Sequence, residues 1–184
     1  MAELATGDLA GLRLEGTEER PPLLPQLLTL VNGAVPLYLE LKPEPGRRQA
    51  LVRAVLDRLA GYAGPCCLAS FDPWSLAWVA WLSPRRVRCL IVSDFPFPGR
   101  SLPDRLASRF FLSALPARPH CIAYDIRGLP NTALGLLRWL GLPVLLWTVA
   151  SREDMDTFSG HGDNIVFEGF LPPSPGHTEG AGCL

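Results

Sequence analysis

Short apolar runs alternate with helical segments along this chain, and this alternation constrains its fold more than any other feature. The apolar runs cover residues 35–42, 65–71, 87–92, 120–126, 143–149 and 164–168. Runs of this length that are apolar at nearly every position and bounded by turn formers are typical of parallel strands buried on both faces. The sequence therefore predicts six parallel strands in chain order.

Each predicted strand except the last is followed by a segment with the features of a helix. We expect these helices at 47–62, 74–82, 103–112, 132–140 and 151–159, with one further helix at 22–31. The strands start roughly every 25 residues, a spacing that suits a (β/α)-barrel or a doubly wound sheet. No glycine-rich phosphate loop follows any strand, which weakens the case for a doubly wound nucleotide-binding fold.

Composition bounds the domain organisation and the partners. The 184 residues are 48% hydrophobic and 19% charged, enough for one globular domain with a substantial core. We expect that domain over residues 1–170, and a disordered tail rich in proline and glycine over residues 171–184. The net charge of −1 offers no electrostatic reason to expect nucleic acid or an anionic membrane surface as a partner. The most apolar region, 133–150, is broken by arginine, glycine and proline, so no membrane span is predicted.

The cysteines and the N-terminus indicate a compartment. The five cysteines are an odd number without the spacing of a disulfide framework. Four of them lie in apolar runs, where we expect small reduced core residues: Cys66, Cys67, Cys89 and Cys121. No Cys-x-x-Cys pair occurs and the histidines are scattered, so a zinc site is not expected. Without a signal-peptide pattern at the N-terminus, these features predict a cytoplasmic protein.

The first predicted strand ends on two opposite charges. Side chains alternate along a strand, so its two faces carry Leu37, Leu39 and Leu41, and Tyr38, Glu40 and Lys42, respectively. Glu40 and Lys42 fit either the wet face of an antiparallel strand or a metal or phosphate site at the mouth of a parallel sheet. The remaining strands favour the second interpretation, because charges inside a barrel are costly unless they are paired, hydrogen-bonded or bound to a metal.

Other polar side chains lie where the later strands end, which is where the site of a (β/α)-barrel forms. They are Ser70, Asp72, Ser93, Asp94, Asp125, Thr148 and Glu168. Several have a simpler interpretation. Ser70 and Asp72 can cap the next helix, whereas Asp94 and Asp125 can be turn residues. Arg127 beside Asp125 can form a surface ion pair that contributes little to stability.

The same comparison applies to one tryptophan and to the histidines. Trp147 ends the fifth strand and can be either a core residue or the wall of a pocket. His120 precedes a strand and is interpreted as a boundary residue. His161 lies in a glycine-flanked loop exposed to solvent, and His177 belongs to the tail. None of the three is expected at a strand end that could form a catalytic site.

Four short motifs resemble those of a known family. Leu-Glu-Leu-Lys lies at 39–42, Ser-Phe-Asp-Pro at 70–73, Gly-Leu-Pro-Val-Leu-Leu-Trp-Thr-Val at 141–149 and Arg-Glu-Asp-Met at 152–155. In this order they resemble the later part of a glycerophosphodiester phosphodiesterase, as does the preceding segment 8–31. The resemblance implies an incomplete α/β TIM-barrel-like fold with about six of eight (β/α) units, in which the first two strands are missing.

The resemblance also implies a function. The family consists of metal-dependent hydrolases that convert a glycerophosphodiester and water to an alcohol and glycerol 3-phosphate, in lipid and glycerol metabolism. Carried over to this chain, it makes Glu40 a ligand of a divalent metal (Mg or Ca), Lys42 a phosphate contact and Trp147 a wall of the substrate pocket. The residue types suit these roles, because a hard cation prefers carboxylate oxygens and a lysine balances the charge of a phosphate.

Two departures from the family limit this expectation. The His-Arg-Gly, Glu-x-Asp and His-Asp motifs that supply the family's catalytic histidines and part of its metal shell do not occur, so no catalytic residue is assigned. The ending Asp-Asn-Ile-Val-Phe-Glu-Gly differs from the usual one, which leaves a role for Glu168 open. We expect either a truncated enzyme that is inactive alone, or a non-catalytic barrel remnant that binds a phosphorylated ligand or a partner. Open sheet edges at the first and last strands predict self-association.

Overall fold

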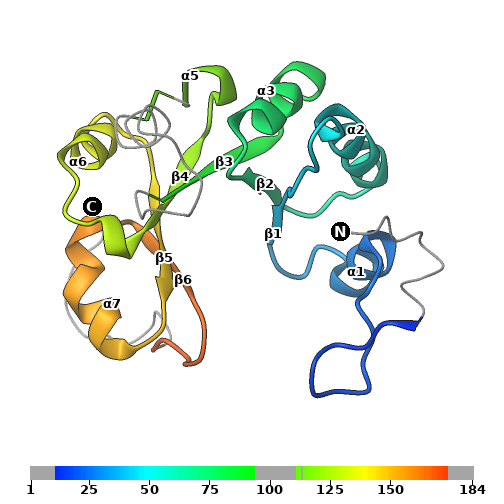
Figure 1. The fold of residues 1–184 in the computed structure, drawn as a ribbon, viewed down its shortest axis with the longest axis horizontal. Coiled ribbons are helices and arrows are strands. Elements are labelled where there is room, and N and C mark those ends of the chain that lie inside the picture. The colour runs from blue at the N-terminus through cyan, green and yellow to red at the C-terminus, as the bar shows by residue number, and fades with distance from the viewer. Residues whose placement is uncertain (1–10, 94–110, 113, 174–184) are drawn as a thin grey trace.

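The computed structural model describes residues 11–93, 111–112 and 114–173. In chain order its elements are α1 (Leu24–Val31), β1 (Leu37–Glu40), α2 (Arg48–Leu59), β2 (Cys66–Ser70), α3 (Pro73–Leu82), β3 (Val87–Val92), α5 (Ala114–Ala117), β4 (Cys121–Asp125), η2 (Ile126–Gly128), α6 (Thr132–Trp139), β5 (Val144–Val149), α7 (Arg152–Phe158), η3 (Ser159–His161) and β6 (Asn164–Phe167) (Figure 1). Most of the predicted helix 103–112, Asp94, His177 and most of the predicted tail lie outside the described residues.

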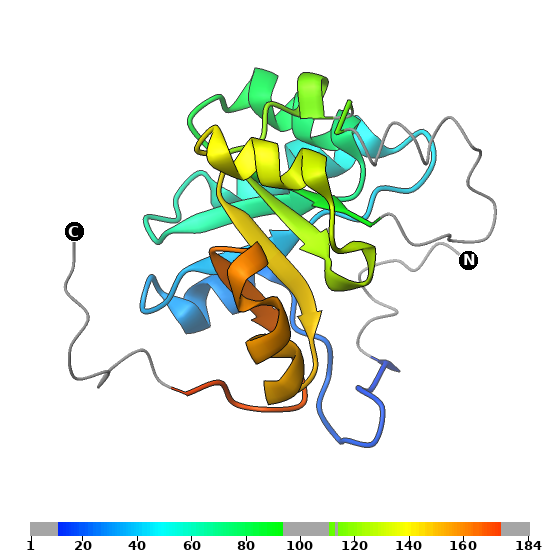
Figure 2. The same ribbon diagram turned by 90° about the vertical axis from the view of Figure 1, so that its left-hand side faces the viewer.

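The six strands form one sheet in the order β1-β2-β3-β4-β5-β6, and each neighbouring pair is parallel. The sheet curls, and helices α2, α3, α6 and α7 lie along its outer side (Figures 1 and 2). This arrangement confirms the predicted fold, a parallel and incomplete TIM-barrel-like half-barrel.

The bounds of the elements follow the predicted ones closely. Strand β3 covers the residues expected for it. Strand β1 is shorter than expected at both ends: it starts after Pro36, which has no N–H to join the ladder, and it ends at Glu40. The short helix α5 was not predicted. Within the described part of the chain, no helix has both the length and the apolar character needed to cross a bilayer.

Both faces of the sheet are apolar, which explains the continuous apolar character of the strands. On β3, Leu90 and Val92 join the core between the sheet and the outer helices, whereas Cys89 and Ile91 belong to a second core on the concave side. On β1, Leu37, Leu39 and Leu41 pack toward α2, as the alternation predicted. The other face of β1 is therefore turned to the inside of the half-barrel.

A buried arginine fastens the amino ends of β3 and β4. Arg88 is 5% exposed and has no carboxylate partner among the described residues. Its guanidinium donates to the carbonyls of Pro84 (3.0 Å), Arg86 (2.8 Å), Ala117 (3.3 Å) and Arg118 (2.9 Å). Burial, followed by the charge of Arg118, lowers the pKa of Arg88. The loops before β3 and β4 are thus held side by side.

Candidate functional site

The concave side of the sheet holds a cavity of about 440 Å³ at the carboxyl ends of the strands. Residues on or directly after all six strands line it: Tyr38, Glu40, Lys42, Phe71, Ile91, Ala123, Trp147, Thr148, Val166 and Glu168. The structure therefore brings together Glu40, Lys42 and Trp147, the three residues expected to contact metal, phosphate and substrate. It adds Glu168, whose role the sequence left open.

Glu40 and Lys42 form an ion pair at the mouth of this cavity. The Oε2 atom of Glu40 lies 3.5 Å from Nζ of Lys42. The Lys42 side chain is 79% exposed and the Glu40 side chain 29% exposed. A pair this exposed contributes little to stability, so a ligand can replace one partner at low cost. A phosphate can therefore replace Glu40 as the partner of the Lys42 ammonium group, while the Glu40 carboxylate binds a cation.

An aromatic pair forms part of the cavity wall. The rings of Trp147 and Phe71 meet edge to face with their centroids 5.5 Å apart. The indole Nε1 of Trp147 donates to the Ala123 carbonyl at 3.0 Å, which fixes the orientation of the ring. Trp147 thus lines a cavity and is only partly buried, and its role as a wall of the substrate pocket stays a prediction. Phe71 was not expected, because a single phenylalanine after a strand gives no sequence signal of its own.

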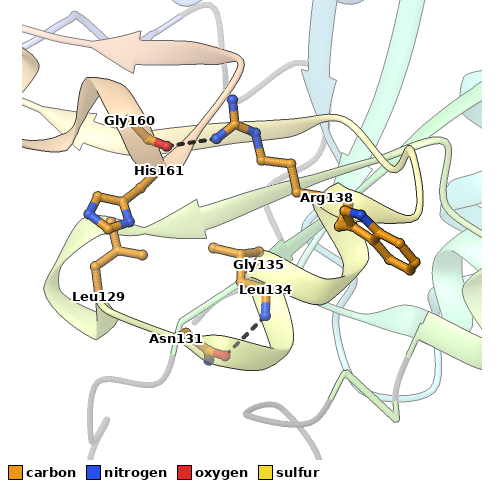
Figure 3. Close-up of a pocket in the computed structure, with 8 residues that line it drawn as sticks. Leu129, Asn131, Leu134, Gly135, Arg138, Gly160 and His161 are labelled. Carbon is orange, nitrogen blue, oxygen red and sulfur yellow. Dashed lines mark hydrogen bonds between the residues drawn. The ribbon is translucent and has the colours of Figure 1, made fainter.

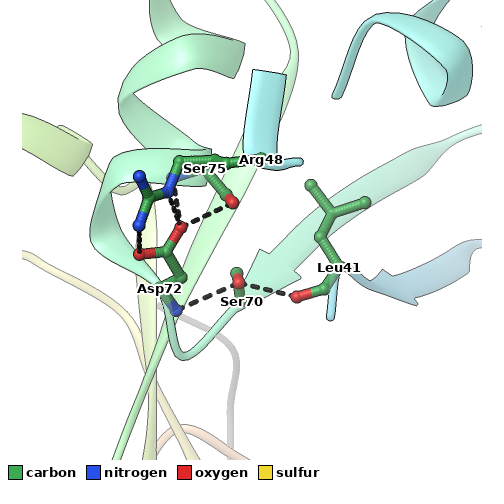
Figure 4. A network of polar contacts seen from close by, with 5 residues as sticks. All are labelled: Leu41, Arg48, Ser70, Asp72 and Ser75. Atoms are coloured by element: carbon green, nitrogen blue, oxygen red, sulfur yellow. Dashed lines mark hydrogen bonds and ion pairs between the residues drawn. The ribbon is translucent and has the colours of Figure 1, made fainter. Parts of the chain in front are cut away.

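A partly buried network of hydrogen bonds holds the end of β1 against β2 (Figure 4). The hydroxyl of Ser70 donates to the Leu41 carbonyl at 2.7 Å and accepts from the Asp72 N–H at 3.0 Å. The Asp72 carboxylate accepts from the Ser75 N–H at 2.8 Å and from Nη2 of Arg48 at 3.0 Å. Leu41 is the residue between the two charges of the site, so this network fixes the backbone that carries them.

The two candidate caps at the end of β2 therefore differ. Asp72 is the N-cap of α3, as its simpler interpretation expected. Ser70 is fully buried and tethers β1 instead of capping the helix. Burial alone would raise the pKa of the Asp72 carboxyl, but hydrogen bonds from Arg48 and Ser75 outweigh it and hold that pKa below its ordinary value.

A second polar cluster lies where β3 and β4 end. Asp125 is 1% exposed and accepts from the Ser93 hydroxyl at 2.7 Å and from Nη2 of Arg127 at 2.6 Å. It also caps the short helix η2, so it is a turn residue as expected. The predicted ion pair with Arg127 forms, but the Asp125 side chain is only 1% exposed, so its carboxylate is not at the surface. Ser93, the residue directly after β3, is bonded to it there. Burial by itself would raise the pKa of Asp125. Hydrogen bonds from Arg127 and Ser93 together outweigh burial, so the pKa lies below its ordinary value.

Neither described histidine lines the candidate site. His120 lies at the amino end of β4, where its Nδ1 accepts from the Arg88 N–H at 3.2 Å. His161 borders a separate outer cavity of about 320 Å³ near α6 (Figure 3). In that cavity Arg138 already donates to the Gly160 carbonyl at 2.7 Å and to Asp163 at 2.9 Å, so its cation is paired. His120 directly precedes β4, as its simpler interpretation expected, and His161 is exposed as expected but ends the short helix η3 instead of lying in a loop.

The carboxylates in the candidate site are the right type of ligand for a hard divalent cation, but they are too few to hold one alone. Glu40 and Glu168 both line the cavity, and carboxylate oxygens are the ligands that magnesium and calcium prefer. Across the described ranges, however, no group of three or more His, Cys, Asp and Glu side chains is arranged to hold a metal ion. These residues can therefore supply part of a coordination shell rather than a closed one.

Comparison with solved structures identifies proteins of the same fold. A provisionally assigned glycerophosphoryl diester phosphodiesterase from Silicibacter pomeroyi aligns with a TM-score of 0.66 and 26% identity over 80% of this chain and 52% of its own length. A phosphodiesterase from Oleispira antarctica, solved with the product sn-glycerol-3-phosphate, aligns with a TM-score of 0.66 and 18% identity over 80% and 57%. A glycerophosphodiester phosphodiesterase from Parabacteroides distasonis aligns with a TM-score of 0.67 and 17% identity, over 90% of this chain and 67% of its own length.

These comparisons cover most of this chain and a smaller share of its neighbours. The chain spans 52 to 67% of the length of the three structures. No family model and no curated protein matches by sequence. The resemblance found in the motifs is nevertheless confirmed by the structure: over 80 to 90% of its length, this chain is similar to the glycerophosphodiester phosphodiesterases and shares the parallel (β/α) fold of part of their barrel.

Proposed function

We propose that this chain provides the phosphate-binding and part of the metal-binding side of a glycerophosphodiester phosphodiesterase site. The observation that supports this most strongly is the convergence of Glu40, Lys42 and Trp147 from opposite parts of the sheet on one cavity. That cavity lies at the carboxyl ends of parallel strands, where (β/α)-barrel enzymes place their chemistry.

The proposed role of each residue follows from its chemistry and exposure. Lys42, the more exposed partner of the ion pair, binds the phosphate as a point charge. Glu40 and Glu168 contribute oxygens to a divalent cation, which when bound polarises the phosphodiester. Trp147 and Phe71 pack against the carbon skeleton of the ligand and keep water from one side of it.

Hydrolysis needs more than these groups. A proton must be removed from the attacking group and another delivered to the leaving alcohol, and each such step typically contributes about 10²–10⁴-fold to the rate. The described lining of the cavity holds no histidine, and its two carboxylates are the proposed metal ligands. The isolated chain is therefore expected to bind glycerol 3-phosphate without hydrolysing glycerophosphodiesters. This favours the second candidate function, a non-catalytic phosphate-ligand module, for the chain on its own.

Calorimetric titration with sn-glycerol-3-phosphate in the presence of magnesium tests the proposal. Lys42→Met should weaken binding by about tenfold or more, because a charge-assisted hydrogen bond is lost. Arg53→Met removes an exposed cation from α2, outside the cavity lining, and should leave the affinity unchanged. Binding that is unaffected by Lys42→Met would contradict the proposed phosphate contact. Glycerophosphocholine incubated with the same protein should release no glycerol 3-phosphate above background.

A further inference from the structure

The end of the molecule opposite the candidate site combines three arginines with an exposed tryptophan. In a parallel (β/α) fold, every loop that leads into a strand lies at the amino end of the sheet. The loops before β3 and β4 carry Arg85, Arg86 and Arg118 there. None of these arginines forms an ion pair with a described residue. The net charge of the whole chain is only −1, so this local group of positive charges is not apparent from the composition.

The three arginines lie together because the chain around them is tightly held. Arg88 bonds the carbonyls of Arg86 and Arg118 at 2.8 and 2.9 Å, which brings the two loops side by side. The Arg86 N–H donates to the Ser83 carbonyl at 3.0 Å, so the chain turns immediately after α3. The loops before β2, β3 and β4, residues 60–65, 83–86 and 118–120, contain no aspartate or glutamate to neutralise this charge.

Large apolar side chains border the same loops. Trp81 at the end of α3 is 69% exposed and Leu115 on the adjacent helix α5 is 76% exposed. The ring of Trp81 meets Trp78 edge to face at 5.3 Å, beside an apolar groove of about 340 Å³ that Trp74 also lines. We call the surface formed by Trp81, Arg85, Arg86, Leu115 and Arg118 the arginine–tryptophan face.

This face also has a depression of a suitable kind for an anion. A cavity of about 280 Å³ is lined by Arg85, Arg86 and Ser83 of the loop before β3, and by Gly64 and Pro65 of the loop before β2. Guanidinium groups bind phosphate oxygens through paired hydrogen bonds. A cationic depression and the exposed apolar side chains of Trp81 and Leu115 therefore lie at the same end of the molecule, the amino end of the sheet.

We propose that the arginine–tryptophan face docks this protein onto an anionic phospholipid surface. Arginines at such a surface pair with the phosphate groups, while tryptophan and leucine insert at the level of the headgroups and first acyl carbons. Exposed Leu115 favours a bilayer over nucleic acid, because an aliphatic side chain offers no ring on which a base could stack. The candidate site, about 20 Å away at the other end of six-residue β3, then faces the water.

Flotation with mixed phosphatidylcholine–phosphatidylglycerol vesicles tests the docking, and separates it from aggregation because bound protein rises with the lipid. The chain should float with these vesicles, should stay behind with pure phosphatidylcholine, and should be released by added salt. The triple variant Arg85→Gln, Arg86→Gln, Arg118→Gln should bind about 100-fold more weakly, at about fivefold for each arginine. Trp81→Gln should weaken binding roughly tenfold.

A matched control removes the same charge elsewhere. Arg20, Arg53 and Arg152 are exposed and lie outside the face, so their triple replacement by glutamine should leave vesicle binding unchanged. Apart from half-buried Arg86, the substituted residues are exposed, and thermal melts of each variant should match the parent. Three outcomes would overturn the proposal: no flotation with anionic vesicles, an equal loss in both triple variants, or tighter binding of a single-stranded oligonucleotide than of the vesicles by the same arginines.

Discussion

At the scale of single residues, the candidate site depends on which charges are buried and which are free. Lys42 is largely exposed and its ion pair with Glu40 is weak, so both remain available to a ligand. Asp125 differs, because its carboxylate is buried and bound by Ser93 and Arg127. The first pair suits binding and the second suits structure, although both lie at the same end of the sheet.

The buried carboxylate predicts a pH dependence of stability. The pKa of Asp125 is held below its ordinary value of 3.8, so its stabilising contribution is complete above that pH and is lost as the pH falls through the lower folded-state pKa. Asp125→Asn should lower the free energy of unfolding by about 2 kcal/mol at neutral pH, and by much less in acid. Urea unfolding at both pH values measures this. Asp156→Asn, on the exposed side of α7, serves as control; an equal effect of the two variants would contradict the assignment.

At the scale of elements, the strands could be predicted more fully than the contacts between loops. Alternation along β1 correctly separated the leucines that face α2 from the charges that face the cavity, because the period of a strand is local information. Phe71 could not be predicted as a site residue, since its place depends on the ring of Trp147 on a distant strand. The burial of Asp125 likewise depends on Ser93, and that of Arg88 on carbonyls from two loops.

Arg88 provides the test at this scale. Arg88→Met should lower the free energy of unfolding by about 3 kcal/mol, because the carbonyls of two loops lose their donors while the apolar stem is kept. Arg88→Lys should recover only part of the loss, since an ammonium cannot reach all the acceptors of a guanidinium fork. Denaturant titration of the three proteins provides the comparison. A methionine variant as stable as the parent would show that the carbonyls are satisfied by water.

At the scale of the whole molecule, the curled sheet has two outer strands. Among the described strands, β1 pairs only with β2 and β6 only with β5. Unpaired strand edges are templates for association with further chains. We therefore predict that the isolated protein self-associates, with an average mass in sedimentation that rises with concentration. A monomer at all concentrations with a cooperative thermal transition would count against this expectation.

The central claim is that the cavity around Lys42 and Trp147 is the ligand site, and nuclear magnetic resonance tests it most directly. In a titration with sn-glycerol-3-phosphate and magnesium, the indole N–H signal of Trp147 and the amide signal of Lys42 should shift together. Trp147→Phe identifies the indole signal among the five tryptophans. The signals of Arg85, Arg86 and Arg118, at the far end of the molecule, should shift only at ligand concentrations well above those that saturate the Trp147 and Lys42 signals. Shifts that gather at those arginines while Trp147 and Lys42 do not move would contradict the account.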